Sequence, residues 1–197
     1  MDRFPQVMQL PHFCATALDA NDGYTWTLTT RLGSMLHEIE EAYGSRDSSW
    51  TLLGVEFGPD APQLWYPGNR KHVVVQLAMN AIDDTPLACY QLAHECVHLL
   101  APGRRPPALV IEEGLATVFS ENYVERNFGL KNVTRLASYK AAAAAVRELF
   151  SLEPSAIRQL RAVQPGFRQF THDTFAQAGL AIPSVLVAQL LLPFQRQ

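Results

Sequence analysis

A helix that is apolar on nearly every side sets the strongest limit on how this chain can fold. It is predicted over Pro86–Leu100, after the acidic N-cap pair Asp83-Asp84 and before Pro102-Gly103. Such a helix must be buried, so the remainder of the chain has to cover it. Three ionisable side chains nevertheless stand in its second half, within His94-Glu95-Cys96-Val97-His98. Buried ionisable groups need compensation, and a divalent cation would supply it.

The pattern H-E-x-x-H places two imidazoles where both can bind one ion. At about 100° per residue, His94 and His98 lie about 40° apart around the helix and one turn apart along it. Glu95 projects beside them, too far round to be a third ligand but able to meet a water on the metal. Two solvated histidines would give the same spacing, and chance produces it in about one chain in a hundred of this size. One turn earlier, Tyr90 and Gln91 are expected to line a cleft.

A third ligand is expected, because a catalytic zinc site keeps three protein ligands and one open position. Glu112 and Glu113 stand in the first turn of the next predicted helix, where acids also complement the helix dipole without binding anything. Gly114 follows them, although glycine costs about 1 kcal/mol relative to alanine inside a helix. A glycine there indicates the close approach of another helix or of an ion. The two acids project about 100° apart, so only one should face the metal.

The predicted elements separate into a first part with a helix and strands and a second part of consecutive helices. Such segregation predicts an α+β fold, and we expect a single domain over 1–197, with a helix-plus-sheet part at 1–82 and a helical part carrying the metal site at 83–197. The first 25 residues are expected to be irregular, with a turn at Asp22-Gly23. Residues 58–70 are expected to form a loop. The remaining predictions are helices over 26–43, 86–100, 111–128, 133–152, 154–163 and 182–192, and strands over 50–57 and 72–79.

Composition and charge indicate what kind of protein this is and which partners it lacks reason to bind. The chain has 197 residues, of which 48% are hydrophobic and 18% charged, and its net charge is −3. This gives enough apolar material for a packed core and no reason to expect nucleic acid or a membrane as partner. Three cysteines without C-x-x-C spacing predict neither a disulfide framework nor an all-cysteine zinc site. No window is apolar enough to span a bilayer, and the first twenty residues do not read as a signal peptide, so we expect a cytoplasmic protein.

The sequence HECVH followed by EEGLATVFSE resembles the gluzincin metallopeptidases, the class of thermolysin and aminopeptidase N, over roughly residues 73–145. The resemblance implies a zincin-like fold, in which a small mixed or antiparallel sheet packs on the H-E-x-x-H helix and a mainly helical half follows. In aminopeptidase-N-like enzymes the second motif reads N-E-G-F-A, and its glutamate is a zinc ligand. The resemblance therefore implies one Zn²⁺ per chain on His94, His98 and Glu113, with Glu95 as the general base of peptide-bond hydrolysis.

The chain departs from these enzymes in two respects. Only 14 residues separate His98 from Glu113, which requires a tight connection. The resemblance also implies that strand His72–Met79 is an edge strand that pairs with a peptide or protein substrate. Aminopeptidase-N-like enzymes have G-A-M-E-N there, whose glutamate holds the free amine of the substrate. In this chain Ala81 follows Ala78-Met79-Asn80, so that glutamate has no counterpart.

Four further residues are candidates for supporting roles. The resemblance implies Tyr139 as the donor that stabilises the oxyanion, although the Y-x-K-G order of the family is not kept and the ring could simply pack at a helix start. His172 is the alternative donor, by analogy with thermolysin-like enzymes, although a surface histidine is the more direct interpretation. Thr117 and Glu112 are candidates for orienting an imidazole of the site, and Thr117 is equally well explained as a plain helix residue.

Three functions remain open from the sequence. The first is a zinc-dependent peptidase, the second a zincin-like binding or regulatory module without activity, and the third a hydrolase of a non-peptide amide. Arg104-Arg105 is expected to be a solvated turn, or alternatively to contact a substrate carboxylate.

Overall fold

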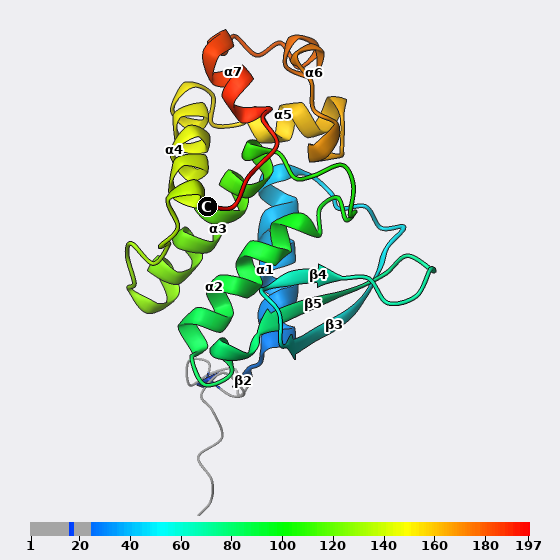
Figure 1. The fold of residues 1–197 in the computed structure, drawn as a ribbon, viewed down its shortest axis with the longest axis vertical. Helices are drawn as coiled ribbons and strands as arrows, with labels where there is room; N and C mark the ends of the chain where they lie inside the picture. The colour runs from blue at the N-terminus through cyan, green and yellow to red at the C-terminus, as the bar shows by residue number, and fades with distance from the viewer. Residues whose placement is uncertain (1–15, 18–24) are drawn as a thin grey trace, which may run out of the picture.

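The computed structural model describes residues 16–17 and 25–197 (Figure 1). The predicted turn at Asp22-Gly23 and nearly all of the predicted irregular start lie outside these residues. Two short strands, β1 (Thr16–Ala17) and β2 (Thr25–Trp26), pair antiparallel. Helix α1 (Leu28–Tyr43) follows, and its N-cap is Thr27, whose hydroxyl accepts from the backbone of Thr30. The apolar positions of α1 face the core as their helical spacing predicts.

A three-stranded mixed sheet follows α1, with the order β3-β5-β4. Strand β3 (Thr51–Gly58) runs parallel to β5 (His72–Ala78), and β4 (Gln63–Trp65) runs antiparallel to β5. The prediction of an unbroken loop over 58–70 is wrong for β4. Prolines at 62 and 67 flank this short strand, so the local sequence predicts a loop. The hydrogen bonds that make it a strand come from the neighbouring β5.

Strand β5 is the middle strand of the sheet, which corrects the expectation that it is an edge strand. Residues 74–76 of β5 are paired with β3 on one side and with β4 on the other. These residues have no backbone groups left for another chain, whereas residues 72–73 and 77–78 of β5 are paired only with β3. The edge strands are β3 and β4, each of which pairs only with β5 among the described residues.

The H-E-x-x-H motif lies on α2 (Thr85–His98), which packs against α1 and against the sheet. Asp84 caps this helix, and a proline occupies its first turn, as predicted. Nine of its fourteen residues are buried, Glu95 and His98 among them. Cys89 and Cys96 are both buried and free, and they contribute to the core as expected.

The second half of the chain is helical, so the described residues form a mixed α+β structure with seven α-helices and one three-stranded sheet besides β1 and β2. The predicted helix over 133–152 begins only at Ala137. The short helix over 172–177 was not predicted. The elements are η2 (Met79–Ala81), α3 (Val110–Phe128), α4 (Ala137–Leu152), α5 (Ala156–Val163), η3 (Phe167–Gln169), α6 (His172–Gln177) and α7 (Ser184–Leu190). None of the described helices is long and apolar enough to cross a membrane.

Gly114 lies where α4 crosses α3 at very short range. A Cβ atom at this position would lie 2.4 Å from the carbonyl oxygen of Ala142 and 2.7 Å from Cγ2 of Val146. The glycine therefore permits close packing of two helices, which is one of the two reasons that the sequence offers for it.

The segment after α7 returns to the centre of the molecule (Figure 1). The backbone nitrogen of Val110 donates to the carbonyl of Leu192 at 2.9 Å, and that of Phe194 donates to the carbonyl of Ala108 at 2.8 Å. This pairing brings the last described residues beside the first turn of α3, where Glu112 and Glu113 stand.

Candidate metal centre

Helices α2 and α3 bring His94, His98 and Glu113 together. Nε2 of His94 lies 3.2 Å from Oε2 of Glu113, and Nε2 of His98 lies 3.7 Å from its Oε1. One ligand atom from each residue can be chosen so that all three lie within 4.8 Å of one another. The set could therefore hold one metal ion, and of the two adjacent acids it is Glu113 that faces the imidazoles.

Glu112 has a different partner, because it points to the far nitrogen of His98. Its Oε1 accepts from Nδ1 of His98 at 2.7 Å, and the side chain is 1% exposed. Arg168, on η3, donates from Nε to Oε2 of Glu112 at 3.1 Å and from Nη1 to the carbonyl of Pro106 at 3.1 Å. A carboxylate on Nδ1 fixes the imidazole and leaves Nε2 for an ion. Glu112 therefore contacts one of the imidazoles that it is predicted to orient.

Thr117 does not take the same role, so that prediction is wrong. Its hydroxyl donates to the backbone carbonyl of Glu113 at 2.8 Å. The two residues are four apart on α3, and a threonine hydroxyl in a helix readily reaches the carbonyl one turn earlier.

His94, His98 and Glu113 form a cluster of ionisable side chains. Within it, burial and the attraction between opposite charges shift each pKa in opposite directions. Burial alone would raise the pKa of Glu113, but the imidazoles of His98 and His94 outweigh it and lower that pKa to about 2. Burial likewise opposes charge on His98, yet Glu113 and Glu112 raise its pKa to about 10. The carboxylates therefore make this pocket strongly favourable for positive charge, which a metal cation also carries.

Glu95 lies beside the cluster and has an elevated pKa. Burial is the main cause, and the imidazoles of His98 and His94 partly oppose it. Among the described residues none donates a hydrogen bond to its carboxylate. A buried carboxylate with a raised pKa and no hydrogen-bond donor, next to residues that could hold a metal ion, is suited to accept and return a proton.

Tyr139 lies on the open side of the cluster, in the first turn of α4. Its ring and that of His94 form a T-shaped pair with centroids 5.6 Å apart, and the ring of Phe194 packs on it with centroids 4.8 Å apart. Burial, reinforced by Glu113, raises the pKa of Tyr139 to about 12, so its phenol remains a hydrogen-bond donor. His172 is exposed at the start of α6 and lines neither cavity beside the cluster, which fits the interpretation as a surface histidine and not the alternative role as donor.

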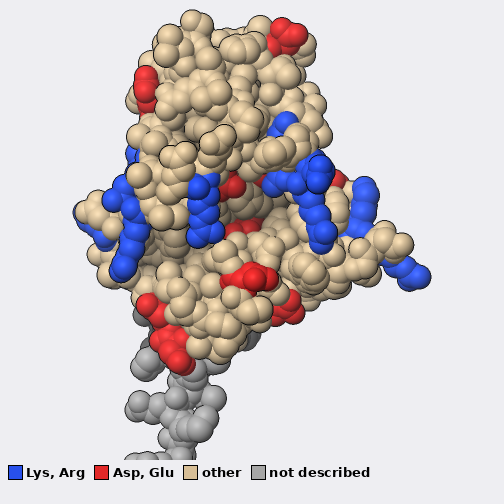
Figure 2. Space-filling model, in the orientation of Figure 1, with Lys and Arg blue, Asp and Glu red and all other residues tan. Residues whose placement is uncertain are grey.

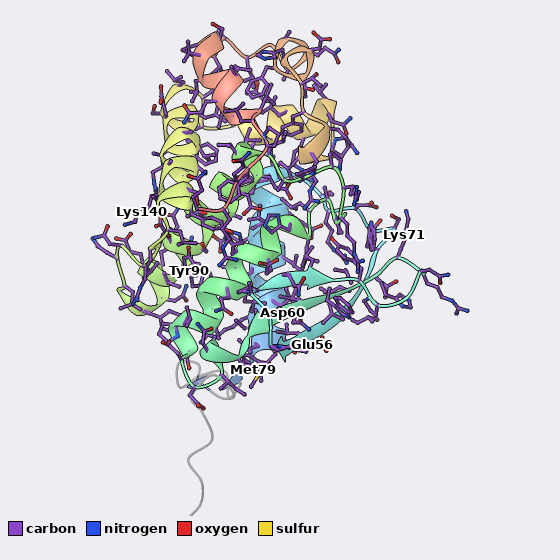
Figure 3. The ribbon with its side chains drawn as sticks, in the orientation of Figure 1. Glu56, Asp60, Lys71, Met79, Tyr90 and Lys140 are labelled. Atoms are coloured by element: carbon purple, nitrogen blue, oxygen red, sulfur yellow. The ribbon has the colours of Figure 1, made fainter. Side chains whose placement is uncertain are left out.

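Two cavities of about 480 Å³ each meet at this cluster. The first lies beside the N-terminal half of α2, and Asp60, Met79 and Tyr90, labelled in Figure 3, line it. The second extends along β4 toward the loop that joins α2 to α3. The linings share four residues, namely Pro62, His94, Glu95 and Tyr139.

The predicted places of Tyr90 and Gln91 are confirmed, since both line the first cavity. Gln91 also ties α2 to the end of β5, because its Oε1 accepts from the backbone nitrogen of Ala78 at 2.9 Å and its Nε2 donates to Oδ1 of Asn80 at 3.2 Å.

Comparison with known proteins adds no relative. No protein-family model matches the chain, and neither the curated proteins nor the solved structures give a match. The function must therefore be argued from the geometry of the cluster and its cavities.

Three residues near the cluster carry no signal in the sequence. Arg168, Phe194 and Arg196 come from segments far along the chain, and none belongs to a motif. The sequence GFRQF at 166–170 is the feature that could have indicated Arg168. Its two phenylalanines are buried and pack on each other, which fixes the backbone that carries the arginine between them.

Proposed function

We propose that this chain is a zinc-dependent hydrolase of the gluzincin type, with a zincin-like fold, that cleaves peptide bonds. The observation that carries the proposal is the grouping of His94, His98 and Glu113 within 4.8 Å, contributed by two neighbouring helices. Two imidazoles and one carboxylate form a donor set typical of catalytic zinc. The surroundings of the three residues also suit a zinc ion, because Glu112 contacts Nδ1 of His98 and leaves its Nε2 available as the ligand atom.

Zinc in this set would act as a Lewis acid and lower the pKa of a coordinated water from near 16 to about 7. Two side chains carry out the remaining steps, the transfer of a proton and the stabilisation of the oxyanion. Glu95 accepts the proton of the attacking water and passes it to the leaving amine. The protonated phenol of Tyr139 donates to the oxyanion of the tetrahedral intermediate. Both residues line both cavities, so a substrate bound across the cluster contacts them.

The free edge of β4 supports a peptide as the substrate. Residues 62–66, which include β4, line the second cavity, and residues 59–62 line the first. An extended peptide can add to such an edge through backbone hydrogen bonds while its side chains enter the neighbouring pockets. A strand paired there would pass Glu95 and Tyr139 at the point where the cavities meet.

Metal analysis tests the ligand set. Protein purified without added ions should contain about one zinc per chain. The Glu113→Ala variant should lose most of it, whereas Glu125→Ala, which removes an exposed glutamate from the same helix, should keep it. Tight zinc in Glu113→Ala would move the third ligand elsewhere.

The Glu95→Gln variant separates a peptidase from a zincin-like binding module. It should keep its zinc and lose turnover of a broad peptide library by about 10²-fold or more, because the general base is gone. A wild-type protein that binds zinc and cleaves no peptide would favour the binding module or a non-peptide amide as substrate. Equal turnover by Glu95→Gln and the parent would refute the mechanism.

A further inference from the structure

The two cavities form one cleft that passes over the metal-ligand cluster. Because Pro62, His94, Glu95 and Tyr139 belong to both linings, the cluster lies in the middle of the cleft and not at its end. A substrate can therefore extend in both directions from the reacting bond. Such a cleft accommodates an internal segment of a polypeptide.

Arginines stand in both halves of this cleft. Arg135 and Arg196 line the first cavity, and Arg104 and Arg168 line the second. Figure 2 shows lysine and arginine side chains on the two sides of a hollow whose floor contains acidic side chains. The whole chain carries a net charge of −3, so this concentration of cations is local and opposite in sign to the average.

The arginines differ in whether an acidic side chain already pairs with them. Arg168 is paired with Glu112, the carboxylate that contacts His98. Arg104 is stacked on the rings of Trp65 and Tyr66, with its Cζ 5.7 Å and 5.1 Å from their centroids, and makes no ion pair within the described part of the chain. The stacking holds its guanidinium beside β4 and leaves the charge available.

The first cavity has free positive charge as well. Neither Arg135 nor Arg196 has an ion-pair partner among residues 25–197. Arg196 lines the cavity together with Glu95 and Tyr139, the groups proposed to act on the substrate. The acid that opposes these two arginines in the lining is Asp60, apart from Glu95 itself.

We propose that the cleft binds an internal peptide segment that carries acidic side chains on both sides of the bond that is cut. This inference rests on the proposed function and names its substrate class. Arg196 receives a carboxylate on one side of the metal-ligand cluster, and Arg104 receives one on the other. Nucleic acid fits less well, since Arg104 already covers the two aromatic rings of the second cavity that could stack with bases, and a base offers no backbone for the edge of β4.

Binding is measured first, because it does not depend on turnover. The protein is the zinc-loaded Glu95→Gln variant, and the probe is an end-blocked, fluorescein-labelled peptide with glutamate at alternate positions. Its twin has glutamine in place of every glutamate. We expect the acidic peptide to bind at least about fivefold more tightly at low salt, with the ratio shrinking as salt is added.

Charge reversal locates the contacts. Arg196→Glu and Arg104→Glu should each remove most of the preference for the acidic twin. Arg70→Glu is the control, because it makes the same charge change at an exposed arginine that lines neither cavity. Equal binding of the twins would overturn the proposal, and so would an equal loss of preference in the Arg70→Glu control. Tighter binding of a single-stranded DNA of similar length would overturn it as well.

The sequence preference of cleavage is measured separately, with end-blocked randomised peptides and the wild-type protein. Acidic residues enriched on both sides of the cut bonds would support the proposal, and cleavage without that enrichment would overturn it while leaving the peptidase assignment intact. If no peptide is cleaved but the acidic twin still binds through Arg196 and Arg104, the assignment of the cleft stands and the proposed hydrolysis fails.

Discussion

Replacing Gly114 by alanine should loosen the contact between α3 and α4 on which the proposed site depends. The added Cβ would lie 2.4 Å from the carbonyl oxygen of Ala142, whereas ordinary contact begins at 3.4 Å. The helices would have to separate by about 1.0 Å at this point, because the opposing atom belongs to the backbone and cannot rotate away. Tyr139 stands in the first turn of α4, so the movement reaches the phenol that faces His94.

Two opposing terms set the size of the effect. Alanine in place of glycine in a helix gains about 1 kcal/mol. Overpacking of a tightly packed interior typically costs about 1–3 kcal/mol, and a clash with backbone belongs at the upper end. The net loss should be about 1–2 kcal/mol, which lowers Tm by about 2–8 °C in a chain of this length.

Thermal unfolding of zinc-loaded protein measures this change, and peptide turnover is followed in parallel. Gly33→Ala is the matched control, because Gly33 is exposed in α1 and no atom lies within 4 Å of a Cβ built there. It should raise Tm slightly through helix propensity alone. We expect Gly114→Ala to lower Tm, to keep its zinc and to lose activity. If both variants gain stability equally, the close approach of α4 does not explain the glycine.

Four further outcomes are expected. Glu112→Gln should weaken zinc binding by about 10- to 100-fold in competition with a chelator, and unchanged affinity would contradict its role on His98. Phe194→Ala should lower kcat more than it raises KM, since it removes the ring that packs on Tyr139; an effect on KM alone would exclude that role. Arg161→Ala should destabilise the fold by about 3 kcal/mol in urea, because its buried guanidinium donates to several backbone carbonyls, and a loss under 1 kcal/mol would contradict this. Removing zinc should lower Tm by about 5–10 °C if free zinc stood at 100 times its Kd, and no shift would mean that the folded chain does not bind it.

Local spacing was enough to predict the part of the site that lies on one helix. His94 and His98 share a face because a helix turns about 100° per residue, whatever surrounds it. The burial of α2 followed equally from its own residues, since an almost wholly apolar helix cannot face water. The same local reasoning placed Glu112 and Glu113 in the first turn of the next helix and required that only one of them face the metal.

Contacts between distant segments were decided by the tertiary structure. Which acid meets the imidazoles depends on how α3 is rotated where it packs against α2. Strand β4 forms because β5 lies beside it, since the four residues between the prolines at 62 and 67 are too few to predict a strand by themselves. A periodic pattern records only which side of an element is buried. It does not record which remote arginine, such as Arg168 or Arg196, will be brought to that side, because such pairings depend on the path of the whole chain.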